Sequence, residues 1–165
     1  MDTQAAFGIQ FVMSIVVFGF LAKWLVVPRL QSLDQREALF WLTIPHAFRH
    51  IGLVFLVPGV VHQPLPGYFS IPAAYGDFLA GLVAFATLAA LRGQWRYAIG
   101  VAWTFNLVGA IDLVNALRHA EVVPHFGAAW YIPMMVVPLL LVTHYLSLRR
   151  LMKMTSLAAE PLPQA

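Results

Sequence analysis

The chain has 165 residues, of which 61% are hydrophobic and 10% are charged, with no cysteine and a formal net charge of +3. Soluble domains carry about 25% charged residues, so this composition excludes an ordinary soluble domain and predicts an all-α integral membrane protein. The lack of cysteine excludes disulfides, thiolate metal sites and cysteine nucleophiles.

Five segments hold the roughly 20 mostly apolar residues that a membrane-crossing helix needs. In chain order they are residues 6–27, 38–61, 72–91, 95–117 and 127–148. The first segment lacks the positively charged start of a signal peptide, so we expect a retained helix. Residues 1–150 are predicted to form one transmembrane domain, followed by an unstructured cytoplasmic tail over 151–165. Because the second segment holds two prolines and three ionisable residues, the alternative is four spans with this segment lying on the membrane surface.

The basic residues test this arrangement. If the five helices alternate in direction, one side of the membrane receives Lys23, Arg29, Arg36, Arg92, Arg96, Arg149, Arg150 and Lys153. The other side receives only Arg118, and Arg49 lies within a span. Positive residues mark the cytoplasmic side. The pattern therefore predicts a bacterial inner-membrane protein with its N-terminus outside and its C-terminus in the cytoplasm. Its partner is the lipid bilayer, and no nucleic-acid partner is expected.

The second segment contains an unusual polar group. His46, Arg49 and His50 are spaced i, i+3 and i+4, which places them on one face of an α-helix. An arginine near the middle of a membrane costs about 2.5–3.5 kcal/mol on insertion scales. We therefore expect Arg49 to have an acidic partner, and the candidates are Asp77 and Asp112.

The third and fourth segments supply these acids. Asp77 lies in a stripe of small residues that allows close helix packing, and Asp112, Asn115 and His119 share one helix face. One interpretation is an ion pair that fixes the register of the helices. The other is a polar site for a small hydrophobic ligand, such as a quinone, in a redox-accessory role. The residues of this predicted site are His46, Arg49, His50, Asp77, Asn106, Asp112 and Asn115.

Two cofactors are compatible with the histidines. His46 and His144 lie in different spans and are candidate axial ligands for a b-type haem. His62, His119 and His125 gather near the outer face and are candidate ligands for a divalent metal.

Residues 49–81 resemble the DoxX-like small membrane proteins. Those proteins have an arginine before a glycine- and phenylalanine-containing helix, a short loop, and then a helix with glycine near an acidic residue. The matching positions are Arg49, Gly52, Phe55, Gly59, Gly76 and Asp77. The resemblance implies a bundle of membrane helices with a redox or quinone-linked accessory role, and it assigns no catalytic residue. The whole chain also resembles uncharacterised small polytopic inner-membrane proteins of bacteria.

Two other functions stay open at the level of sequence. One is a small proton-coupled transporter. The other is a structural subunit, with other membrane proteins or a second copy of the chain as partners. No motif of a particular reaction is present, so the sequence does not decide whether the chain is an enzyme.

Overall fold

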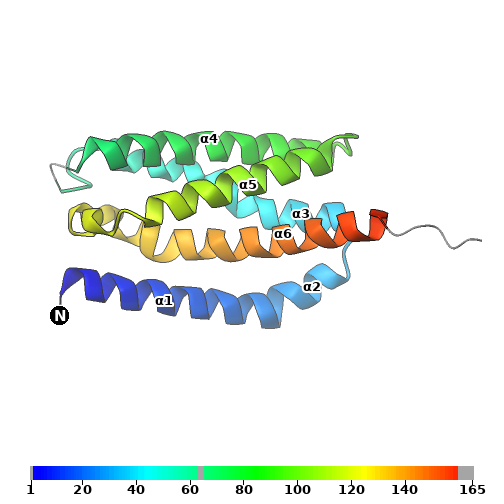
Figure 1. Ribbon diagram of the computed structural model, residues 1–165, viewed down its shortest axis with the longest axis horizontal. Coiled ribbons are helices and arrows are strands. Elements are labelled where there is room, and N and C mark those ends of the chain that lie inside the picture. Colours follow the sequence, from blue (N-terminus) through cyan, green and yellow to red (C-terminus); the bar gives the residue numbers. More distant parts are fainter. Residues whose placement is uncertain (1, 63–64, 160–165) are drawn as a thin grey trace, which may run out of the picture.

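The computed structural model describes residues 2–62 and 65–159, and in this part the chain forms a bundle of helices. Figure 1 shows them running along the long axis of the molecule, with α1 and α2 at the opposite side of the bundle from α4. The elements are α1 (Thr3–Leu21), η1 (Ala22–Val26), α2 (Val27–Gln31), α3 (Gln35–Thr43), η2 (Ile44–Leu56), α4 (Gly67–Arg92), α5 (Ala98–Leu117), η3 (Ala120–His125), η4 (Gly127–Trp130), η5 (Ile132–Val136) and α6 (Val137–Ala159).

Five helical segments are long and apolar enough to cross a membrane. They are Thr3–Gln31, Gln35–Leu56, Gly67–Arg92, Ala98–Leu117 and Gly127–Met154. The predicted all-α bundle of five helices is therefore confirmed. The connection from α2 to α3, the connection from α4 to α5 and the C-terminal end of α6 lie at the same end of the bundle (Figure 1).

Several predicted boundaries were wrong. Pro28 does not end the first segment, because the π-helical turn η1 comes just before it and the helix then continues to Gln31. A π-turn adds a residue to the helical repeat, which accommodates a proline that cannot donate its backbone N–H. The unstructured tail expected from residue 151 is helical as far as Ala159. Residues 160–165 lie outside the described part of the chain.

The second segment changes its helical geometry midway. Asp34 caps α3 by accepting a hydrogen bond from the backbone N–H of Glu37 at 2.8 Å, and η2 then continues as a 3-10 helix of 13 residues. With rises of about 1.5 and 2.0 Å per residue, α3 and η2 together reach about 40 Å. That length exceeds the roughly 30 Å hydrocarbon core of a bilayer, so the alternative of a segment lying flat is not needed.

The 3-10 geometry corrects the predicted polar face. Three residues make one turn in such a helix, so His46, Arg49, Gly52 and Phe55 fall in line, and all four are buried. His50 is turned away from this line and is exposed, with its ring Nδ1 3.1 Å from the carbonyl oxygen of Ala47. The prediction that His50 shares the face of Arg49 was wrong, because it assumed the 3.6-residue turn of an α-helix.

Helix η2 packs closely on α4, and glycines make this possible. A Cβ atom at Gly52 would overlap the side chain of Asp77. One at Gly81 would lie 3.4 Å from the backbone nitrogen of His50. These contacts hold the polar residues of η2 directly against α4.

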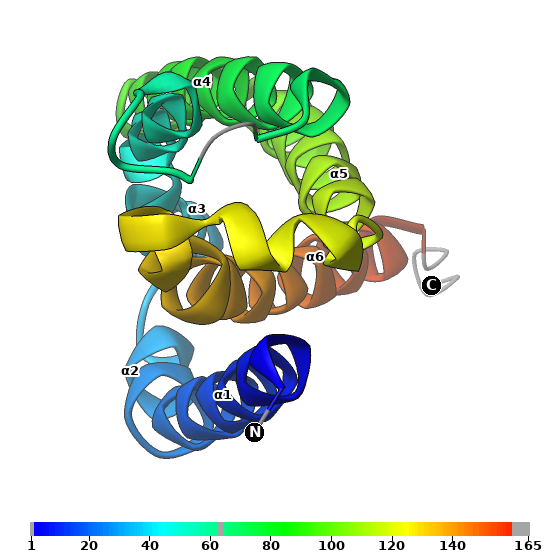
Figure 2. The ribbon, with the colours of Figure 1, turned by 90° about the vertical axis from the view of Figure 1, so that its left-hand side faces the viewer.

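Helix α1 is the least buried of the five. In the most apolar stretch of the segment Thr3–Gln31, only 6% of the residues are buried within the chain. Ile9, Val12 and Val16 expose large apolar side chains. Its inner side packs on α6, η3 and η5, and Figure 2 shows α1 and α2 beside α6, away from α4. Phe7 points inward, with its ring 6.1 Å from that of Phe126.

We predict that Gly52→Ala destabilises the protein by about 1–3 kcal/mol, the usual cost of overpacking, because the new methyl group meets Asp77. The measurement is reversible unfolding in mixed micelles. Gly100→Ala in α5 is the matched control, since no atom lies within 4 Å of its added Cβ. Equal stability of the two variants would contradict the close packing of η2 on α4.

Candidate functional site

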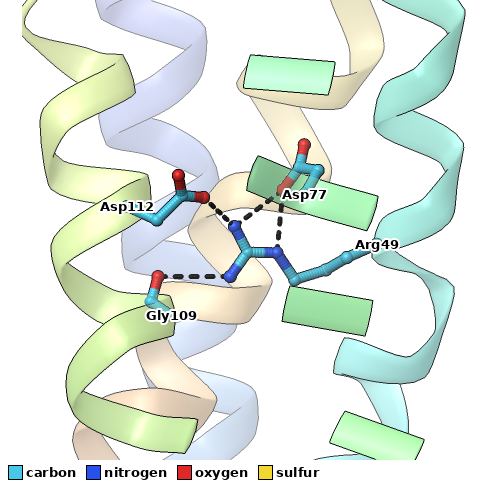
Figure 3. A network of polar contacts seen from close by, with 4 residues as sticks. All are labelled: Arg49, Asp77, Gly109 and Asp112. Atoms are coloured by element: carbon cyan, nitrogen blue, oxygen red, sulfur yellow. Dashed lines mark hydrogen bonds and ion pairs between the residues drawn. The ribbon is translucent and has the colours of Figure 1, made fainter. Parts of the chain in front are cut away.

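Arg49 lies at the centre of a buried ionic network that joins three helices (Figure 3). Its Nε donates to Oδ1 of Asp77 at 2.8 Å, and its Nη2 lies 2.7 Å from the same oxygen. The Nη2 group also donates to Oδ2 of Asp112. Its Nη1 donates to the carbonyl oxygen of Gly109 at 3.1 Å. The predicted ion pair is confirmed, and both candidate acids take part in it.

Small residues give the charged groups the room they need. A Cβ at Gly76 would lie 2.5 Å from Oδ1 of Asp112, and one at Gly109 would lie 3.1 Å from Nη1 of Arg49. A side chain at Gly76 would displace the Asp112 carboxylate. One at Gly109 would overlap the His144 ring and crowd the Arg49 guanidinium. The network therefore depends on glycine in both α4 and α5, as well as on the charged residues.

The three charged side chains differ in exposure. The Arg49 side chain is 0% exposed, that of Asp77 is 14% exposed and that of Asp112 is 30% exposed. An unpaired charge buried in an apolar medium is very unfavourable, so the two acids allow Arg49 to be fully buried. Asp112 is the member of the network that is most accessible from outside.

A second polar group lies beside the network. The His144 ring lies 4.0 Å from the His46 ring, measured between centroids, and both residues are almost fully buried. Asn106 donates its Nδ2 to the carbonyl oxygen of Ala102 at 2.8 Å. Its Oδ1 faces Nδ1 of His144 at 2.9 Å. Asn106 therefore positions His144 rather than contacting Arg49.

Each histidine ring is held by one hydrogen bond. Nε2 of His46 is hydrogen-bonded to the Thr143 hydroxyl at 2.9 Å, and this hydroxyl also lies within reach of the carbonyl oxygens of Leu139 and Leu140. The Asn106 oxygen can only accept, so Nδ1 of His144 donates to it and carries a proton. Nδ1 of His46 and Nε2 of His144 have no hydrogen-bond partner among the described residues.

This arrangement does not fit haem. Two imidazoles that ligate one iron lie on opposite sides of the porphyrin plane, so the macrocycle must separate them. Rings with centroids 4.0 Å apart are already at contact distance, and each ring is held by its own hydrogen bond. The prediction that His46 and His144 are axial ligands was wrong, because their places on different spans do not fix the spacing between their rings.

The predicted metal ligands do not assemble. Within residues 2–62 and 65–159, no group of three or more His, Cys, Asp or Glu side chains could hold a metal ion. His62 and His125 are joined through their backbones, with His62 N–H donating to the His125 carbonyl at 2.9 Å. His119 donates instead to Glu121 at 3.1 Å. The pKa of Glu121 is lowered by a hydrogen bond to its own backbone and by that from His119.

An apolar pocket reaches the ionic network between the start of α4 and the end of α5. Its cavity volume is about 70 Å³, and the pocket is partly open to the outside. Its polar lining comes from Asp77, Asp112 and His119. The aromatic lining is Phe7, Phe55, Phe69 and Phe126. A smaller pocket between α4 and α5 brings Asp112, Asn115 and His119 together, as their shared helix face predicts.

The sequence interpretation missed the four phenylalanines and Gly109. The phenylalanines come from α1, η2, α4 and the turn after η3, so no local pattern connects them. Gly109 precedes Asp112 by three residues, and this helical spacing was a signal that the glycine lies on the same face.

The chain matches the family described as a domain of unknown function, DUF8737, over residues 6–152, and it belongs to that family. No curated protein and no solved structure matches the chain. The family match names no DoxX-like group, so the resemblance of residues 49–81 stays a prediction.

We predict that Arg49→Met lowers the free energy of unfolding by about 3–5 kcal/mol, since it leaves two carboxylates without their cation. Combining it with Asp112→Asn should give a loss smaller than the sum by about 0.5–3 kcal/mol. Unfolding in mixed micelles measures both effects, and the exposed Arg96→Met is the control. Strictly additive losses would show that Arg49 and Asp112 do not interact.

Proposed function

We propose that this membrane protein binds a small, largely hydrophobic molecule in the pocket above Arg49, Asp77 and Asp112. The single observation behind the proposal is that four phenylalanine side chains line a pocket that also reaches the two carboxylates. Ligand sites are typically concave and mostly apolar, with a few polar groups that orient the ligand. Charged residues within a membrane are, by default, candidates for such a role.

The polar groups of the pocket define which ligands fit it. The Arg49 side chain is fully buried and already bonded to Asp77, Asp112 and Gly109. When they are ionised, the two carboxylates can accept hydrogen bonds but cannot donate them. A ligand that donates hydrogen bonds therefore fits better than a quinone, whose carbonyl oxygens need donors. The redox-accessory role, the transporter and the structural subunit stay predictions.

We also propose that the protein lies in the bacterial inner membrane with the pocket on the outer side. The support is the positive-inside rule together with the shared end of the α2–α3 and α4–α5 connections (Figure 1). The pocket is formed near the opposite end, by the start of α4 and the end of α5.

For the ligand, we expect small hydrophobic molecules to be extracted with the purified wild-type protein and detected by mass spectrometry. Ala116→Phe should remove them, because Ala116 lines the pocket. Ala86→Phe, at an exposed position of α4, is the control for the added ring and should retain them. Recovery of no such molecule, or equal recovery from both variants, would contradict binding in this pocket.

For the orientation, single cysteines are informative because the chain has none of its own. Glu121→Cys should react with a membrane-impermeant maleimide in intact spheroplasts, and Gln94→Cys only after the membrane is opened. The reverse labelling pattern would show that the pocket faces the cytoplasm.

A further inference from the structure

We propose that the ligand is an amphiphilic organic cation, with a substituted ammonium group at Asp112 and an apolar body among the phenylalanine rings. This inference rests on the proposed function, because it names the chemical class of the molecule that the same pocket binds. It stands on the charge of the network, the exposure of its members and the aromatic lining.

The first step is the charge balance. Two carboxylates share one guanidinium, and Arg49 is the only ion-pair partner of Asp77 and Asp112 within the described residues. With both acids ionised, the network has one negative charge in excess. Such a charge in an apolar environment is costly unless it is paired. A bound monovalent cation would make the site neutral.

The second step concerns access. Asp112 is 30% exposed at its side chain, whereas Asp77 is 14% exposed. Asp112 lines both the aromatic pocket and the smaller pocket beside it. One of its oxygens accepts from Arg49, which leaves the carboxylate able to accept from a second donor. The ammonium group is therefore expected at Asp112 rather than at Asp77.

The third step concerns the aromatic rings. Phe55, Phe69 and Phe126 form a cluster with ring centroids 5.7–5.9 Å apart, and Phe7 lies 6.1 Å from Phe126. Ring faces attract cations, and aromatic cages recognise substituted ammonium groups by this interaction. The same rings accept the apolar part of the molecule. An inorganic cation would gain much less from this lining, because it carries no apolar surface to bury.

The test compares two molecules of nearly the same shape, benzyldimethylammonium, whose N–H can donate to a carboxylate, and its neutral carbon analogue isobutylbenzene. Binding to the purified full-length protein in a non-ionic detergent is measured by ligand-observed NMR. We expect the cation to bind about tenfold or more tightly than the analogue. Ala116→Phe should abolish binding of the cation.

Charge variants give the decisive comparison. Asp112→Asn keeps the size of the side chain and an acceptor for Arg49 but makes the network neutral, so the preference for the cation should disappear. Asp34→Asn makes the same chemical change at the cap of α3, outside the pocket, and should keep the preference. If Asp112→Asn does not fold, Asp77→Asn removes the same charge and tests the same expectation.

The outcomes separate the two proposals. Equal binding of both molecules, blocked by Ala116→Phe, would overturn the cation proposal and leave the hydrophobic-ligand proposal standing. A preference for the cation that persists in the neutral variants would also overturn the cation proposal. If neither molecule binds, the cation proposal fails, and the extraction experiment then decides separately whether the pocket binds any hydrophobic molecule.

Discussion

The structure depends on one guanidinium group shared by two carboxylates. In an apolar medium, Arg49 cannot remain charged without partners, and its partners come from α4 and α5. The network therefore fixes the positions of η2, α4 and α5 relative to one another. The same requirement brings acidic groups to a depth where the bundle encloses a pocket, so the structural and the functional interpretations of Arg49 are compatible.

The unusual backbone of the second segment serves this arrangement. A long 3-10 helix is uncommon because its hydrogen-bond geometry is poorer than that of an α-helix. Here it lines up His46, Arg49, Gly52 and Phe55 on one narrow face. On that face, Gly52 lies against the side chain of Asp77, and Phe55 lines the pocket. Helix α1 adds Phe7 to the lining while exposing most of its own surface, which gives the first helix a role at the site.

The sequence predicted the features that follow from composition and local spacing. Five apolar segments and the pairing of Arg49 with an aspartate both follow from the cost of placing polar groups in lipid. The predicted orientation of His50 was wrong, because the sequence carries no clear local signal for the change from α-helical to 3-10 geometry. The His46–His144 contact and the phenylalanine cluster depend on how distant helices pack, which spacing along the chain does not encode.

Solid-state NMR on the protein in lipid bilayers tests the central claim most directly. Dipolar recoupling between ¹⁵N-labelled guanidinium groups and ¹³C-labelled aspartate carboxyl carbons detects pairs in direct contact, and Asp77→Asn and Asp112→Asn assign each signal. The structure predicts that Arg49 Nη2 couples to the carboxyl carbons of both Asp77 and Asp112. Coupling to only one of them, or to neither, would contradict the shared ionic network.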